Sequence, residues 1–303
     1  MINKHNIKPT LILISGPTAT GKSALSVEMA RRLDTDIISA DSRQIYSGIP
    51  IVTAVPTEEE RRGVKHHLME VLPLDAYYSA SEFERDALQI TRRLLEERGV
   101  AVACGGSMMY VDALCHGIDE LPTVPHDIRS QLTDELSQNG SEWLVAELER
   151  LDPDYYNIVD KNNLKRVFHA VEIIRASGST YTSLRTGQKK ERDFNIVKIL
   201  LEAERPILFD RINRRVDCMV EAGLEEEAHK VWPLRQLNSL NTVGLKEMFA
   251  WFEGSMTRAE AIERIKKNTR VYAKKQITWR KKDPSWIRLD IAHLDPARIL
   301  NLI

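Results

Sequence analysis

Residues 16–23 read GPTATGKS, and this short segment limits the possible folds more than any other part of the chain. It fits the pattern G-x-x-x-x-G-K-[ST], whose glycines let the backbone wrap around an anion while the lysine adds a positive charge. The pattern is informative only between a buried strand and a helix. The apolar run TLILIS at 10–15 precedes it, and a helical pattern over 22–33 follows. The segment is therefore predicted to bind phosphate groups at the carboxyl end of a parallel strand.

Strand and helix patterns alternate through much of the remaining chain. Further strands are predicted at 36–41, 100–104, 195–201 and 286–291. Further helices are predicted at 81–98, 206–223 and 224–234. Ser81 and Glu84 fit a capping box at the start of the first of these helices, and Gly99 follows its end. The alternation predicts an α/β fold, a P-loop NTPase-like parallel sheet flanked by helices.

The middle of the chain departs from this alternation. Residues 121–187 show only helical periodicity, with expected breaks at Gly140 and Gly178. We therefore predict two domains: a P-loop-containing α/β core domain formed by residues 1–120 and 188–303, and an all-helical insertion domain that interrupts it.

Composition excludes several classes of protein. The chain is 43% hydrophobic and 29% charged, which is ordinary globular usage, and no apolar run approaches the roughly 18 residues that a membrane span requires. Three scattered cysteines, Cys104, Cys115 and Cys218, lack Cys-x-x-Cys spacing. This pattern is typical of reduced thiols, so a cytoplasmic protein without a membrane partner is expected.

A net charge of -1 hides one strongly basic segment near the C-terminus. Ten Lys and Arg face only two glutamates there, a surplus of eight positive charges; the ten are residues 258, 264, 266, 267, 270, 274, 275, 280, 281 and 282. Such a helix suits a nucleic-acid backbone. The alternative is a solvated amphipathic helix with an inward apolar face of Ile262, Ile265, Tyr272 and Trp279.

Asp41 is the second candidate for a role in chemistry. It stands at the carboxyl end of the predicted second strand, where open parallel sheets place their ligands. Its carboxylate could act as a general base or hold Mg²⁺ through water, or it could simply form a local Asx turn. Together with the phosphate loop, it leaves an ATP-dependent kinase, an ATPase and an enzyme using an organic diphosphate all open.

Seven segments, in order, resemble the motifs of the bacterial tRNA dimethylallyltransferase (tRNA isopentenyltransferase) family. They are GPTATGKS at 16–23, ISADSRQIY at 38–46, TAVP at 53–56, HHL at 66–68, GGSMMY at 105–110, VGLKE at 243–247 and TRVYAKKQITW at 269–279. The resemblance covers nearly the whole chain.

The resemblance implies transfer of the dimethylallyl group of dimethylallyl diphosphate to N6 of the tRNA adenosine that is 3′-adjacent to the anticodon. It implies Asp41 as general base, with Lys22 and Arg215 acting on the diphosphate, and Mg²⁺ as cofactor with Ser23 as its ligand. The implied diphosphate-binding residues are Gly16, Pro17, Thr18, Ala19, Thr20, Gly21, Lys22, Ser23 and Arg215.

The implied macromolecular partner is the anticodon stem-loop of tRNA, and a monomeric enzyme is expected. The implied tRNA-binding residues are Asp41, Ser42, Arg43, Gln44, Ser107, Arg129, Lys165, Arg166 and His169. Ser107 replaces a usual threonine and keeps the hydroxyl, whereas His169 stands where the family usually has arginine.

Other functions remain alternatives at this stage. An adenylate isopentenyltransferase would act on free AMP, ADP or ATP, and a P-loop kinase would need only the phosphate loop. A nucleic-acid-binding ATPase would also combine a phosphate loop with a basic surface. The insertion and the basic segment favour tRNA, because a free nucleotide needs neither.

Overall fold

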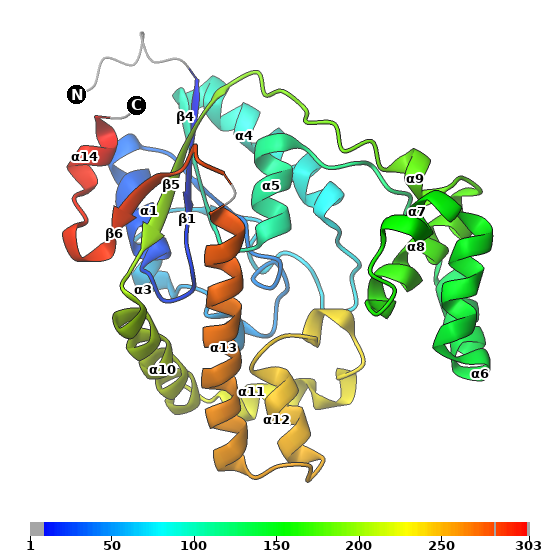
Figure 1. Cartoon of the computed structure of the whole chain (residues 1–303). Helices are drawn as coiled ribbons and strands as arrows, with labels where there is room; N and C mark the ends of the chain where they lie inside the picture. Colours follow the sequence, from blue (N-terminus) through cyan, green and yellow to red (C-terminus); the bar gives the residue numbers. More distant parts are fainter. Residues whose placement is uncertain (1–8, 282, 302–303) are drawn as a thin grey trace. The chain divides into compact units, whose positions relative to one another are not determined.

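The computed structural model describes residues 9–281 and 283–301. A six-stranded parallel sheet forms the middle of the larger of two compact units, which comprises the described residues up to Cys115 and from Arg192 onward (Figure 1). The strands are β1 (Thr10–Ser15), β2 (Ile37–Ser39), β3 (His66–His67), β4 (Val100–Gly105), β5 (Asn195–Glu202) and β6 (Ile287–Asp290), in the order β3-β2-β4-β1-β5-β6. β1 pairs along its full length with β4 on one side and β5 on the other. The phosphate loop therefore leaves the middle of the sheet.

Helices cover both faces of this sheet. α1 (Lys22–Leu33) contributes Leu25 and Met29 to one core, together with Ile12 and Ile14 of β1. α4 (Ala80–Arg98) and α5 (Met108–His116) pack over the alternate residues of β1 on the opposite face. Because successive side chains of a strand point to opposite faces and both faces are covered, β1 is apolar without interruption.

A third apolar core joins helices that lie beyond the carboxyl ends of the strands. It is formed by α2 (Pro50–Thr53), α10 (Arg205–Glu221), α11 (Leu224–Val231), α12 (Leu245–Phe252) and α13 (Arg258–Arg280). The short helix α3 (Glu58–Arg61) follows α2 in the chain. The unit that contains the sheet also has α14 (Pro296–Leu300) and three short 3₁₀ turns, at Trp232–Leu234, Asn238–Leu240 and Ile291–His293. α13 packs against both α10 and α12.

Residues 116–191 form a separate compact unit. Its helices are α6 (His126–Leu151), α7 (Pro153–Ile158), α8 (Leu164–Ser177) and α9 (Tyr181–Leu184), and they enclose a core of their own. Gly140 interrupts α6 with a non-helical backbone at φ 81°, and Gly178 ends α8 at φ 70°. Both predicted breaks are therefore present.

Two local predictions need correction. The capping box of α4 is formed by Ser79 and Glu82, not by Ser81 and Glu84: the Ser79 hydroxyl accepts the Glu82 N–H at 3.2 Å, and the Glu82 carboxylate accepts the Ser79 N–H at 2.6 Å. The strand expected at 36–41 is also shorter than predicted, so Asp41 lies in the loop that follows β2. None of the helices in the described part of the chain has the length and apolar character of a membrane span.

Candidate active site

The phosphate loop has the backbone geometry of an anion cradle. A Cβ on Gly16 would lie 2.6 Å from the Leu201 carbonyl oxygen, so no side chain fits there. Gly21 precedes α1 in the left-handed region at φ 87°, and the Thr20 hydroxyl donates to the Pro17 carbonyl at 2.8 Å. The N-terminus of α1 therefore follows a tight turn and adds its positive dipole end to the loop amides.

Lys22 is the charged group of this loop. Its Nζ donates to the Pro17 carbonyl at 2.8 Å, which folds the side chain back over the loop. Burial lowers the pKa of Lys22 to about 8, and the charge of Arg215 acts in the same direction, while Cys104 and Asp41 oppose it. Lys22 therefore stays largely protonated at pH 7 but loses its charge within a readily accessible pH range.

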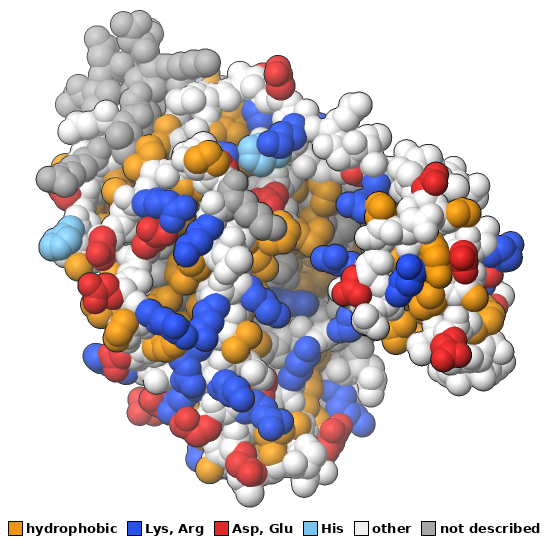
Figure 2. Space-filling model, in the orientation of Figure 1, with side chains coloured by type: hydrophobic (Ala, Val, Ile, Leu, Met, Phe, Trp, Pro, Cys, Tyr) orange, Lys and Arg blue, Asp and Glu red, His pale blue; other side chains and the backbone are white. Residues whose placement is uncertain are grey.

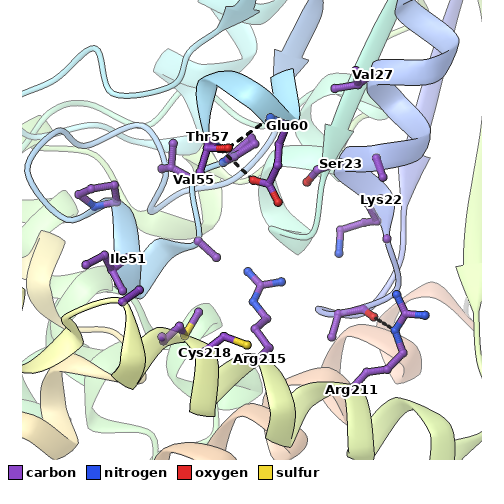
Figure 3. A pocket seen from close by; sticks show the side chains of 18 of the residues that line it. Lys22, Ser23, Val27, Ile51, Val55, Thr57, Glu60, Arg211, Arg215 and Cys218 are labelled. Carbon is purple, nitrogen blue, oxygen red and sulfur yellow. Dashed lines mark hydrogen bonds between the residues drawn. The ribbon is translucent and has the colours of Figure 1, made fainter. Parts of the chain in front are cut away.

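A cavity of about 1020 Å³ opens beside the loop (Figure 3). Lys22 from α1 and Arg215 from α10 both point into it, and Ser23 also lines it. Burial lowers the pKa of Arg215, opposed by the charges of Asp41 and Glu60. The apolar part of the lining includes Val27, Ile51, Val55, Pro56 and Met219. A cationic end beside apolar walls suits a diphosphate that carries a short hydrocarbon group.

Asp41 uses its two carboxylate oxygens differently. Oδ1 accepts the backbone N–H groups of Arg43 at 2.9 Å and Gln44 at 3.4 Å, which is the Asx turn considered as an alternative. Oδ2 has no hydrogen-bond partner among residues 9–281 and 283–301. Asp41 does not line the cavity, yet its charge opposes the lowered pKa values of Lys22 and Arg215. One oxygen therefore fixes the turn, and the other is not used by the described part of the chain.

The turn after β4 holds the Asp41 loop in place. Ser107 Oγ accepts the Ser42 N–H at 2.8 Å and donates to Ser42 Oγ at 3.1 Å. The Ser107 N–H donates to the Ala40 carbonyl at 3.3 Å. A Cβ on Gly105 would lie 2.1 Å from that same carbonyl oxygen, so this close approach requires glycine. The structure thus brings together Asp41, Ser42 and Ser107.

Arg43 and Gln44, two of the residues expected to contact tRNA, have partners within the chain. The Arg43 guanidinium donates to the carbonyls of Asn238, Ser239 and Asn241 at 2.8, 3.0 and 3.3 Å. Gln44 Nε2 donates to the carbonyls of Thr53 at 3.1 Å and Ala54 at 3.0 Å. A direct contact of either side chain with RNA would have to replace these bonds.

In the helical unit, one buried carboxylate holds two of the expected tRNA-binding residues. Glu172 is 3% exposed, and it accepts Arg129 Nε at 2.8 Å and Nη2 at 3.0 Å, and binds His169 Nδ1 at 2.8 Å. Burial raises the pKa of Glu172, but the bonds from His169 and Arg129 outweigh this and lower it. Lys165 and Arg166 are exposed in the first turn of α8.

The basic segment corresponds to α13, and Lys and Arg side chains gather over α10 and α13 in Figure 2. Not all ten positions form one exposed face. Arg280 is only 2% exposed, Lys266 is held by Asp217 at 2.8 Å and Glu263 at 3.1 Å, and Lys282 lies outside the described residues. Exposed basic side chains remain at residues 258, 264, 267, 274, 275 and 281.

The apolar face of α13 also differs from expectation. Ile265 is buried and Ile262 packs against the third core, as predicted. Tyr272 and Trp279 are each 38% exposed, so these two do not pack fully inward. In their place, the buried face of the helix includes Gln276 and Arg280.

Two residues at the site were missed from the sequence. Arg211 Nε donates to the Ala19 carbonyl at 2.8 Å and thus steadies the phosphate loop (Figure 3). It precedes Arg215 by four residues on α10, and this helical spacing could have revealed it. Gln276 accepts the Thr18 N–H at 3.1 Å across 258 residues of sequence, a contact that no local pattern indicates.

Comparisons with known proteins agree with this geometry. The model of the IPP transferase family matches residues 44–283. The chain is 52% identical to "tRNA dimethylallyltransferase 1" of Bacteroides thetaiotaomicron, covering 91% of this chain and 89% of the relative. It is 50% identical to "tRNA dimethylallyltransferase 2" of Parabacteroides distasonis, covering 93% and 95%.

Solved structures show the same likeness. A full-length tRNA isopentenylpyrophosphate transferase from Bacillus halodurans has 36% identity and a TM-score of 0.70, with 97% of this chain and 94% of that chain covered. A eukaryotic dimethylallyltransferase acting on tRNA has 25% identity and a TM-score of 0.77, with 93% and 74% covered.

Proposed function

The chain belongs to the IPP transferase family, and from this premise we propose that it transfers the dimethylallyl group of dimethylallyl diphosphate to tRNA. The acceptor is N6 of the adenosine 3′-adjacent to the anticodon, and the other product is diphosphate. The observation that carries the proposal is a phosphate loop whose Lys22 feels the charge of Asp41, a carboxylate that keeps one oxygen unbonded within the described residues. A phosphate loop beside a carboxylate would also fit a kinase. The relatives that are 52% and 50% identical to this chain favour the transferase instead.

The diphosphate end of the cavity supports departure of the leaving group. As the bond between C1 of the dimethylallyl group and its oxygen breaks, the electron pair stays on the diphosphate. Lys22, Arg215 and the loop amides face this growing negative charge in a partly enclosed site, where fixed positive groups stabilise it more strongly than water does. The apolar walls accommodate the hydrocarbon part.

Asp41 supplies the base. The exocyclic amine of adenine is a weak nucleophile, and it becomes effective when a carboxylate accepts its proton as the C–N bond forms. Oδ2 of Asp41 is the free oxygen, and the Asx turn fixes its direction. The partner RNA is the anticodon stem-loop. Because the adenine must reach the carboxyl ends of the strands, its nucleotide leaves the anticodon stack. We expect the protein to be a monomer and to act in the cytoplasm.

The residues present fit a magnesium ion held mainly by the substrate. In the described ranges 9–281 and 283–301, no group of three or more His, Cys, Asp or Glu side chains could hold a metal. Mg²⁺ in phosphate sites needs only one or two protein ligands besides phosphate oxygens and water. Ser23 lines the cavity on the first turn of α1, directly after Lys22, and would be that ligand. A bound ion would add positive charge near the leaving diphosphate.

Labelling distinguishes this function from its alternatives. The protein is incubated with dimethylallyl diphosphate labelled in its hydrocarbon part and with either total tRNA or AMP, with Mg²⁺ present. Label in tRNA alone is expected. Label in AMP would indicate an adenylate isopentenyltransferase, and ATP-dependent phosphorylation without any prenyl transfer would indicate a kinase.

Ser23→Ala is expected to raise the Mg²⁺ concentration for half-maximal transfer about tenfold or more, because a metal ligand is lost while Lys22 and the loop amides remain. The measurement is a titration of initial rate against Mg²⁺ at saturating substrates. Ser81→Ala, on α4, is the matched control and should keep the wild-type Mg²⁺ dependence. An unchanged titration for Ser23→Ala would remove Ser23 as a metal ligand.

Neutralising Lys274 and Lys275 together is expected to weaken tRNA binding and flatten its salt dependence. Each lost phosphate contact should remove about 0.7–0.9 unit from the slope of log affinity against log salt. Filter binding at several salt concentrations measures this. Lys266→Ala is the control on the same helix, because its ammonium group is already held by Asp217 and Glu263. If the paired variant keeps the wild-type slope, α13 is only a solvated face.

A further inference from the structure

Gln276 of α13 bridges the two loops that the reaction uses. Its Oε1 accepts the backbone N–H of Thr18 in the phosphate loop at 3.1 Å. Its Nε2 donates to the carbonyl of Gly106, in the turn after β4, at 2.9 Å. The side chain is only 4% exposed, so both bonds are shielded from water. One amide group thus uses its acceptor and one of its donors to join loops 88 residues apart.

The second loop leads directly to Asp41. Gly106 precedes Ser107, whose hydroxyl accepts the Ser42 N–H at 2.8 Å and whose own N–H binds the Ala40 carbonyl. The phosphate loop is therefore connected through Gln276, and through the peptide bond between Gly106 and Ser107, to the residues on both sides of Asp41. The neighbouring strands β1 and β4 are also joined, because Ser15 Oγ donates to the Gly105 carbonyl at 2.8 Å. That bond connects the strand ends, whereas Gln276 connects the loops that follow them.

The turn after β4 lies close against this amide. A Cβ on Gly106 would lie 2.4 Å from Gln276 Nε2, so a side chain at position 106 would displace the glutamine. On α13, Gln276 shares the buried face with Ala273 and Arg280. The glutamine therefore fills the space between the loops.

We propose that Gln276 is a positioning residue that sets the distance between the leaving diphosphate and the Asp41 carboxylate. The inference rests on the proposed transferase function. Reacting groups must meet within a few tenths of an ångström, and a misplacement of about 1 Å can cost roughly 10²-fold in rate. Gln276 touches neither reacting group and acts through Thr18 and Gly106.

Two substitutions separate its two hydrogen bonds. Gln276→Leu removes both while keeping most of the volume. Gln276→Glu keeps an acceptor for the Thr18 N–H but, when ionised, places a carboxylate oxygen against the Gly106 carbonyl; when protonated, it regains a donor. We expect Gln276→Leu to lower kcat about 10²-fold, with a much smaller change in the Kd of dimethylallyl diphosphate. For Gln276→Glu, the ratio of its kcat to that of the wild type should rise as the pH falls.

The experiment measures kcat with tRNA, the Kd of dimethylallyl diphosphate by calorimetry, and the unfolding temperature for each variant. Gln89→Leu and Gln89→Glu, at an exposed glutamine of α4, are the matched controls and should resemble the wild type. Expressing rates as a ratio to the wild type at each pH removes the pH dependence that the variant shares with the wild type. If Gln276→Leu does not fold, the pH dependence of the folded Glu variant decides.

Failure of the two proposals is distinguishable. If the wild type transfers no prenyl group to tRNA, the proposed function fails. If the wild type is active and Gln276→Leu has the same kcat, or if the Glu variant is slow by a factor that does not change with pH, the positioning role is overturned.

Discussion

Replacing Asp41 by asparagine is expected to lower kcat by about 10²–10⁴-fold while leaving the binding of dimethylallyl diphosphate nearly unchanged. The asparagine carbonyl can still accept the N–H groups of Arg43 and Gln44, so the Asx turn survives. What is lost is the basic Oδ2. Steady-state kinetics with tRNA, together with a direct measurement of the diphosphate Kd, separate the two effects.

Asparagine is a sharper choice than alanine because alanine would also release the turn. Asp75→Asn, at an exposed carboxylate, serves as the matched control and should keep wild-type kinetics. A variant at position 41 that turns over at close to the wild-type rate would show that another group accepts the adenine proton. A large loss of diphosphate affinity would instead place Asp41 in the diphosphate site.

Lys22→Met is expected to reduce both kcat, by about 10²–10³-fold, and the affinity for dimethylallyl diphosphate. In the proposed reaction the charge would contact the leaving group in the bound substrate and stabilise it more as negative charge grows, so both constants should change. Lys65→Met, at an exposed position, is the control. An unchanged kcat would exclude a role on the leaving group.

The pH dependence of binding gives a second readout for Lys22. Its pKa of about 8 in the free protein means that the ammonium form dominates at pH 7 and the neutral amine at pH 9. Only the ammonium form attracts the anion, so wild-type affinity for dimethylallyl diphosphate should fall as the pH rises from 7 to 9. Lys22→Met has no group that titrates there and should show a flatter profile, which calorimetry at several pH values measures.

Local sequence signals predicted the parts of the fold that depend on neighbouring residues. β1 and α1 have the predicted bounds, because an unbroken apolar run, a glycine turn and a helical pattern lie side by side in the sequence. The capping box of α4 shows the limit of such signals. Ser79 with Glu82 and Ser81 with Glu84 fit the same pattern, and in the structure the buried Glu84 pairs instead with distant Arg192 at 2.8 Å.

The residues of the candidate site fall into the same two groups, those that a local sequence signal marks and those that it does not. Lys22, Ser23 and Asp41 were predicted because a motif or a strand end marks them locally. The partners that fix the loops were not predictable, since Gln276 meets Thr18 only after the whole sheet is formed. The burial of Arg280 was missed for a similar reason: the sequence marks it as one more charge, whereas α13 turns it toward Ser15, whose hydroxyl lies 3.2 Å from its Nε.

The interrupted α/β unit has a consequence for the order in which the chain matures during synthesis. β5, one of the two neighbours of β1, is separated from it by the complete helical unit, so Thr10 meets Asn195 across 185 residues. The helical unit is one continuous stretch with its own core, and it leaves the ribosome before β5 does. Arg215 and Gln276 are translated later still. A nascent chain therefore has the material for its helical unit while the phosphate loop still lacks one of its two flanking strands, so the phosphate site can be completed only after the helical unit has been synthesised.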